Sequence, residues 1–383
     1  MVRHRRHHLV ALGMILLGML VLSRSIVGAA PPWVAPQSLA QGNVDPQGAA
    51  LAVDSAGRVH VVWSAEGWLW HRVRTGESWS PAQGVMVGHT PDLAADAAGH
   101  VHLVCAAQAE GADEIYWISW TTSEGWGLPT NLSETPEDSS APRLAVAADG
   151  ALAVVWSETT PGGPRVYLAR SADGITWSSA PVPNAWGVRP VVTWGPGNAL
   201  WVAWQEPLDE GLPDEIWCAQ WTSEGWTLPV DISASPAAAS VAPALAAHQE
   251  GVLLAWQEMT TEGPRVFTAR WDRGNWSSPA QRSSGTGFAP WLALSAQGQG
   301  YLAWTGDRAV EVRPWSAPTD TWSPVEEVAG GLEDPAEARL ALGAVPYALW
   351  LAPDGQGGYD LLFSLRGEPA PAQRLFLPLI RRS

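Results

Sequence analysis

Acidic residues recur at matching places along this chain, in or beside segments where polar loops are expected. Three glutamates each follow a repeated tryptophan by two residues. Two acidic pairs precede predicted third strands, and a further acidic pair lies in the longest predicted loop. These residues are Asp113, Glu114, Glu158, Glu206, Asp209, Glu210, Asp214, Glu215 and Glu258. Carboxylates gathered on one face can bind cationic peptides, sugar hydroxyls or Ca²⁺. The alternative is a solvated acidic face that aids solubility.

Composition excludes several kinds of chemistry. All 22 basic residues are arginine, so Schiff-base chemistry and a lysine-bearing phosphate loop are excluded. The net charge of −16 makes nucleic acid an unsuitable partner, because phosphate binding needs a basic surface. No run has EF-hand spacing, so Ca²⁺ remains only an open alternative, and we expect no metal site and no cofactor.

Histidine and cysteine offer little for catalysis. His100 and His102 alternate along a predicted strand and could place two imidazoles on one face, but no third ligand is evident. Cys105 and Cys218 fall in different repeats, so we expect two buried free thiols rather than a disulfide.

One unit repeats seven times, and two independent tryptophan markers keep the same period of about 48 residues. The first marker ends an apolar segment, with cysteine replacing tryptophan once. Its positions are Trp63, Cys105, Trp156, Trp204, Trp256, Trp304 and Trp350. The second marker follows a later turn. Its positions are Trp79, Trp126, Trp177, Trp226, Trp276 and Trp322.

Each unit alternates apolar and polar residues with a period of two, as in 58–63, and turn residues separate the segments. Four short antiparallel strands per unit of this length predict the blade of a β-propeller. The seventh unit lacks the second marker, and Trp33 to Gln37 supplies a matching segment. The sequence therefore predicts an all-β, seven-bladed propeller closed by an N-terminal strand, with six blades as the alternative.

A second level of repetition links blades two and four, and blades three and five, at an offset of 100 or 101 residues. It indicates duplication of a two-blade segment. The duplication also alternates acidic pairs (113–114 and 214–215) with Arg165 and Arg265 on successive blades. These charges could form ion pairs between blades, which would make them structural.

The segment Ser171-Ala172-Asp173-Gly174-Ile175-Thr176-Trp177 resembles the Asp-box of sialidase-like propellers, although it is one residue shorter than the usual motif. Eroded forms occur in other blades. The resemblance covers residues 33–366 as a blade pattern and implies a folding role for Ser171, Asp173, Gly174, Thr176 and Trp177. In such a turn, serine and aspartate satisfy backbone groups while the tryptophan packs inward.

A catalytic sialidase needs three convergent arginines, a tyrosine with a nearby glutamate, and an aspartate acid/base. The Arg-Ile-Pro tripeptide that usually carries the first arginine is absent, and Arg189-Pro190 and Arg313-Pro314 stand in other contexts. The resemblance therefore indicates a non-catalytic member of the family.

The ends of the chain have distinct compositions. Residues 1–29 carry a basic start, an apolar run over 9–22 and small residues near 27–29, which is typical of a signal peptide, with an uncleaved anchor as the alternative. We expect the propeller over 31–366 and a tail over 367–383. The tail is either a sorting or surface-retention segment, or else a final strand or a frayed end.

Together these features predict a secreted or cell-surface, monomeric module that binds glycan or an extracellular protein through its acidic loop face, without enzymatic activity. The alternatives are a glycoside hydrolase (exo-sialidase-like) or a lyase of sialidase-like fold that acts at the mouth of the channel, and a scaffolding repeat domain. No membrane span is expected in the mature chain.

Overall fold

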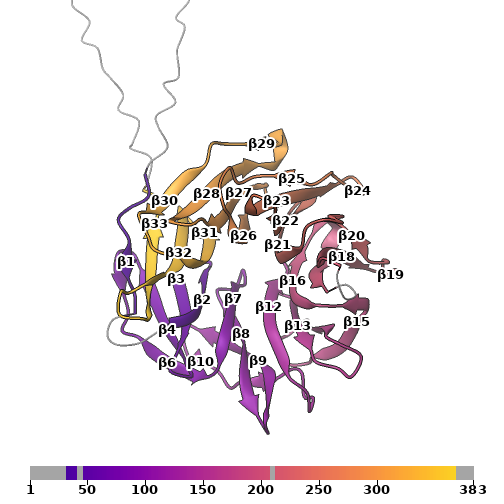
Figure 1. Cartoon of the computed structure of the whole chain (residues 1–383). Coiled ribbons are helices and arrows are strands. Elements are labelled where there is room, and N and C mark those ends of the chain that lie inside the picture. Colours follow the sequence, from indigo (N-terminus) through magenta and orange to yellow (C-terminus); the bar gives the residue numbers. More distant parts are fainter. Residues whose placement is uncertain (1–31, 41–45, 208–211, 368–383) are drawn as a thin grey trace, which may run out of the picture. The chain divides into compact units, whose positions relative to one another are not determined.

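The computed structural model describes residues 32–40, 46–207 and 212–367, and in it seven antiparallel sheets are arranged in a ring (Figure 1). This confirms the predicted all-β, seven-bladed propeller and contradicts the six-bladed alternative. No helix among the described residues is long and apolar enough to cross a membrane. The expected signal peptide (1–29) and nearly all of the expected tail lie outside the described residues.

The blades follow one another along the chain, and each begins with the strand nearest the centre of the ring. Blade 1 consists of β2 (Pro46–Val53), β3 (Val59–Ala65), β4 (Trp68–Thr75), β5 (Ser78–Trp79) and β6 (Gln83–Val87). Blade 2 consists of β7 (His89–Ala95), β8 (Val101–Ala109), β9 (Ala112–Thr121), β10 (Gly125–Trp126) and β11 (Thr130–Asn131). Blade 3 consists of β12 (Ser139–Val146), β13 (Leu152–Glu158), β14 (Arg165–Ser171) and β15 (Ser178–Trp186).

The remaining blades repeat this plan. Blade 4 consists of β16 (Val188–Trp194), β17 (Leu200–Glu206), β18 (Glu215–Thr222), β19 (Gly225–Trp226) and β20 (Val230–Asp231), with a 3-10 turn at Pro196–Asn198. Blade 5 consists of β21 (Ser240–His248), β22 (Gly251–Thr260), β23 (Gly263–Asp272), β24 (Asn275–Trp276) and β25 (Ala280–Gln281). Blade 6 consists of β26 (Phe288–Leu294), β27 (Gln299–Thr305), β28 (Ala309–Ser316), β29 (Thr321–Trp322) and β30 (Glu326–Gly330), with a 3-10 turn at Ala317–Thr319. Blade 7 consists of β31 (Ala336–Leu342), β32 (Pro346–Pro353), β33 (Tyr359–Leu365) and β1 (Gln37–Ser38).

Blade 7 is completed by the N-terminal segment, as the sequence predicted. Gln37 pairs with Phe363 across the antiparallel β1–β33 ladder, and the Leu39 amide donates a hydrogen bond to the Leu361 carbonyl at 2.8 Å. The inner strands β2 and β31 contact each other and join blade 1 to blade 7. Closure of this kind leaves no inner sheet edge open for pairing with another chain.

The core lies between blades, where the first tryptophan marker fills each interface. Trp156, Trp204, Trp256, Trp304 and Trp350 are completely buried. Trp204, for example, packs with Val155 and Val166 of the preceding blade. A blade cannot bury both faces alone, so these large side chains stabilise the stacking of neighbours. Both cysteines are buried and free, as predicted.

Every inner strand has an irregular register close to its start. Within it a residue adopts a left-handed backbone conformation in six blades: Thr90, Ala141, Arg189, Ala242, Ala289 and Glu337. Proline follows this residue in five of these blades. Non-glycine residues in this conformation cost on the order of 1–3 kcal/mol each, so the surrounding fold must impose it.

A buried polar chain joins blades 1 and 2. The Trp126 indole N–H donates to His71 Nδ1 at 3.1 Å, His71 Nε2 lies 3.1 Å from His60 Nδ1, and His60 Nε2 lies 3.2 Å from an Asp54 carboxylate oxygen. Because the indole can only donate, His71 must carry its proton on Nε2 and His60 must do the same. The chain therefore has one neutral arrangement that satisfies every nitrogen.

Candidate functional site

The glutamates that follow the tryptophan markers accept hydrogen bonds from those same tryptophans. The Trp156 indole N–H donates to Glu158 at 2.9 Å, and Trp256 donates to Glu258 at 2.8 Å. Residues two apart on a strand share a face, which explains the Trp-x-Glu pattern without a ligand. Glu206 accepts from Trp204 at 2.9 Å, and burial raises the pKa of Glu206.

Glu158 and Glu258 also hold the loops that enter their own blades. Hydroxyls of Ser139 and Thr135 donate to Glu158, and Ser240 and Ser235 donate to Glu258 in the same way. The offset of about 100 residues between the two sets matches the sequence duplication. Both carboxylates are buried and fully engaged. Each carboxylate therefore links the entering loop to its blade through hydrogen bonds.

Glu114 and Glu215 lie in the preceding blades and form hydrogen bonds with these same loops. Glu114 accepts from the Thr135 amide at 3.1 Å, and Glu215 accepts from the Ser235 amide at 2.9 Å. Glu114 also accepts a hydrogen bond from the Ser133 hydroxyl, and Glu215 accepts one from the Ser233 hydroxyl. The side chains expected to line a binding face therefore satisfy loop groups instead.

The remaining predicted carboxylates have separate surroundings. Asp113 lies 3.1 Å from His89, and Asp214 accepts from the Gln205 side chain at 2.6 Å. Asp209 and Glu210 lie outside the described residues.

The prediction of ion pairs between blades is wrong. Within the described residues, Arg265 pairs with Glu262 of its own blade at 3.7 Å. The Arg165 guanidinium lies 5.0 Å from the Trp186 ring centroid and forms no ion pair with a described acidic residue. Glu114 and Glu215 are already satisfied by hydroxyl and amide donors, so they need no arginine.

The turn that resembles an Asp-box is held by its own polar side chains. One Asp173 carboxylate oxygen accepts from the amides of Ile175 and Thr176 at 2.8 Å each. Ser171 Oγ donates to the same oxygen at 3.0 Å and accepts the Gly174 amide at 2.9 Å. These hydrogen bonds lower the pKa of Asp173 to about 2. Trp177 is half-buried at the interface with blade 2.

A cavity of about 430 Å³ occupies the centre of the ring where the seven inner strands begin. All seven blades line it through the residues around the strand irregularities. Its polar and aromatic groups come from Gln47, Thr90, Ser140, Arg143, Arg189, Trp291, Glu337 and Arg339. A smaller cavity further along the inner strands is also lined by Arg143 and Trp291, and it reaches Asp92.

Arginine and tryptophan side chains from blades 3, 4, 6 and 7 meet in this cavity. The Arg339 and Arg143 guanidinium groups lie 4.6 and 5.9 Å from the Trp291 ring centroid. Trp291 is fixed by a hydrogen bond from its indole N–H to the Leu340 carbonyl at 3.1 Å. Arg189 is exposed and has neither a hydrogen bond nor an ion pair within the described part of the chain.

The cavity has an excess of positive charge in a strongly acidic protein. Arg339 is offset by Glu337, whose carboxylate lies 3.6 Å away, while Arg143 and Arg189 have no such partner among the described residues. Burial raises the pKa of Asp92, and the charges of Arg143 and Arg339 offset only part of that effect. Burial also lowers the pKa of Arg339. This arrangement suits an anionic ligand with a ring or apolar face.

Sequence reasoning missed this cavity because its members are far apart in the chain. Arg143, Trp291 and Arg339 each stand two residues after the left-handed residue of their inner strand. The proline that follows that residue in five blades recurs with the blade period (91, 142, 190, 243 and 290). That marker could have placed these side chains at one level of the ring.

Comparisons with known proteins support the fold alone. No family model and no curated protein matches the chain. The polysaccharide lyase Uly1 has a TM-score of 0.56 at 12% identity, with 90% of this chain and 93% of the lyase covered. An ulvan lyase of family PL25, solved bound to -[GlcA(1-4)Rha3S]-, has a TM-score of 0.52 at 10% identity, with 76% and 79% covered.

The structural neighbours also include a sialidase from Trypanosoma rangeli, with a TM-score of 0.47 at 10% identity, covering 74% of this chain and 56% of the sialidase. A likeness at this level does not assign a family. Membership of the sialidase-like Asp-box family therefore stays a prediction.

Proposed function

We propose that this protein is an exported, non-enzymatic propeller that binds an acidic saccharide in its central cavity. One observation carries the proposal: Arg143, Arg189 and Arg339 come from three blades and line a single cavity that also contains Trp291. We therefore propose a binding site at the centre of this face of the ring, whereas the sequence predicted one on the acidic loops of the same face.

Different residues of the cavity would contact different parts of an acidic saccharide. Arginine binds carboxylate or sulfate groups through charge-assisted hydrogen bonds, and neither Arg189 nor Arg143 forms a direct ion pair with a carboxylate among the described residues. Trp291 offers an aromatic surface for a sugar ring. Hydroxyls of Thr90 and Ser140 line the same cavity and can contact sugar hydroxyls.

Binding is favoured over catalysis by the composition of the cavity wall. The described residues that line the central cavity include no tyrosine and no histidine. Histidine is the residue that most often transfers protons in enzymes. Glu337 is the one carboxylate among the described lining residues, and it pairs with Arg339 at 3.6 Å. The ulvan lyase, which has the same fold, was solved with a glucuronate-containing saccharide, and this agrees with an acidic ligand for a propeller.

The proposal is tested by titrating uronate-containing oligosaccharides and neutral oligosaccharides of equal length into the full chain. The acidic series should bind and the neutral series should not. Loss of one charge-assisted contact costs about 1.5–3 kcal/mol, so Arg143→Gln and Arg189→Gln should each weaken binding roughly 10- to 150-fold. Arg273→Gln is the matched control, because that side chain is 91% exposed in an outer turn of blade 5. Equal binding of both series, or unchanged affinity in both cavity variants, would refute the proposal.

A second function is favoured by Asp92. A buried carboxyl with a raised pKa beside arginines could donate a proton to a glycosidic oxygen, with Glu337 as the second carboxylate. If the protein is a hydrolase, incubation with a bound saccharide will release products detectable by mass spectrometry, and Asp92→Asn will abolish their release without preventing binding.

A further inference from the structure

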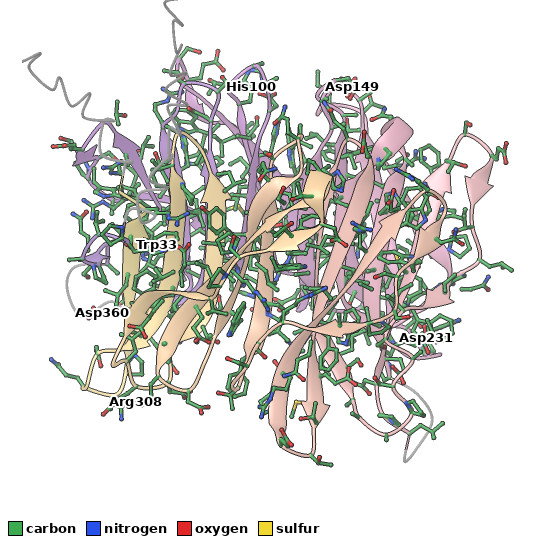
Figure 2. The ribbon with its side chains drawn as sticks, turned by 90° about the horizontal axis from the view of Figure 1, so that it is seen from above. Trp33, His100, Asp149, Asp231, Arg308 and Asp360 are labelled. Atoms are coloured by element: carbon green, nitrogen blue, oxygen red, sulfur yellow. The ribbon has the colours of Figure 1, made fainter. Side chains whose placement is uncertain are left out.

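A second cluster of side chains able to bind a ligand lies on the opposite face of the ring from the central cavity. Each inner strand runs from the cavity face to a turn on the other face, and Asp96, His100 and His102 follow the end of β7. Figure 2 shows His100 at one rim, together with Asp149 of the corresponding turn in blade 3, while Arg308 lies at the other rim. The cluster is therefore separate from the proposed saccharide site.

Three potential metal ligands converge there. The Asp96 Oδ2 atom lies 2.8 Å from His100 Nδ1 and 3.5 Å from His102 Nε2, and all three ligand atoms lie within 4.8 Å of one another. Ligands about 2.0–2.2 Å from a tetrahedral zinc ion are separated by roughly 3.3–3.6 Å. Small side-chain movements suffice to reach that geometry.

His102 lacks the partners that a buried imidazole normally has. Its side chain is only 7% exposed, and neither ring nitrogen has a hydrogen-bond partner among the described residues. The ring stacks on Trp117, with 5.8 Å between centroids, which fixes its orientation toward Asp96.

Blade 1 contains an equivalent turn in which an arginine side chain supplies the positive charge. Asp54, Arg58 and His60 occupy the positions that Asp96, His100 and His102 occupy in blade 2. There the Arg58 guanidinium lies 2.6 Å from the Asp54 carboxylate, and His60 is satisfied on both nitrogens.

In blade 2 the guanidinium is replaced by an imidazole, which leaves the carboxylate without a permanent positive charge. The cluster borders a cavity of about 500 Å³, which Asp173 and Gly174 of blade 3 also line. This space gives an ion access from solvent and leaves room for a water molecule as a fourth ligand.

We infer that Asp96, His100 and His102 form a binding site for a divalent transition-metal ion of the zinc class. Two imidazoles and one carboxylate are ligands that zinc, cobalt and nickel accept, whereas Ca²⁺ and Mg²⁺ prefer sites made only of oxygen. On binding, the proton on His100 Nδ1 moves to solvent, or to Nε2 of the same ring, whose side chain is 47% exposed. Sequence analysis found the two histidines but not Asp96, which reaches them only because the turn folds back on itself.

The test titrates Zn²⁺ and Co²⁺ into the full chain, purified without a polyhistidine tag and stripped with EDTA. His100→Arg places the blade 1 residue in blade 2 and should fold normally, while His100→Gln removes the ligand without adding charge. Histidines near the N-terminus give the same background in every protein.

Wild type should bind one equivalent more than either variant, and its Co²⁺ complex should show a visible absorption band that both variants lack. Zn²⁺ should raise the Tm of wild type more than that of His100→Arg. Equal stoichiometry in wild type and both folded variants, whether zero or greater, would overturn the inference.

Discussion

The buried chain from Trp126 to Asp54 makes the stability of the propeller sensitive to acid. His71 accepts the Trp126 N–H on Nδ1 and donates from Nε2 to His60, so its ring has no free lone pair for a second proton. Burial, with a smaller effect from His60, lowers the pKa of His71 from 6.5 to about 3. In the unfolded chain the same imidazole titrates near its ordinary value.

The pKa difference fixes both the sign and the size of the effect. Between pH 6.5 and about 3 the unfolded state binds a proton at His71 that the folded state does not, so stability falls as the pH falls through that window. The slope is about 1.36 kcal/mol per pH unit for one proton. His71 alone therefore removes about 2.5 kcal/mol from the free energy of unfolding between pH 7.5 and 4.5.

His71→Gln keeps a donor toward His60 but cannot titrate. We expect it to be less stable than wild type at pH 7.5 and to close that gap by about 2.5 kcal/mol at pH 4.5. Urea unfolding of the full chain, followed by circular dichroism at four pH values, measures both curves.

Trp126→Phe should also flatten the wild-type curve, because it frees His71 Nδ1 to accept a proton. Trp177→Phe is its matched control, because that half-buried indole has no hydrogen-bond partner among the described residues. Curves for wild type and His71→Gln that stay parallel from pH 7.5 to 4.5 would refute the reasoning.

Three further predictions concern other parts of the fold. Glu158→Gln should lower the free energy of unfolding by about 1–3 kcal/mol without changing saccharide affinity, whereas Glu124→Gln in an exposed turn should change neither. Leu39→Ala, which truncates a side chain only 1% exposed beside the closing strand, should cost about 2–5 kcal/mol in urea unfolding, and Leu128→Ala, at a site 88% exposed, should cost little. Ellman's reagent should modify neither thiol before denaturation, because both are buried and burial raises the pKa of Cys105 to about 12.

The ring itself could be predicted because its markers are local and periodic. Trp156 and Trp204 recur at a fixed place in the blade, and the segment from Trp33 to Gln37 indicated the missing fourth strand of the last unit. Each of these signals reports on a strand and its nearest neighbours, which the chain specifies within about 50 residues.

The sites were harder to predict because they depend on contacts between blades. Glu158 looked available for a ligand, since nothing in the sequence indicates that Ser139 and Thr135 turn back toward it. Arg143 and Arg339 stand nearly 200 residues apart and meet only when the ring closes. Residue type and spacing identified candidate groups, but hydrogen bonding decided which of them remain free for a ligand.

The closing strand also determines the order in which the protein can be completed during synthesis. Ser364 donates a hydrogen bond to the Val34 carbonyl at 2.7 Å across 330 positions of the chain. At 5–20 residues per second, a ribosome needs roughly 15–65 s to produce the partner of a segment already made. During that interval the first strand has no sheet to join, and blade 1 has no blade 7 against which to pack Trp63. The last blade to be translated thus depends on a segment made about 330 residues earlier, and the ring closes only when that segment pairs with β33.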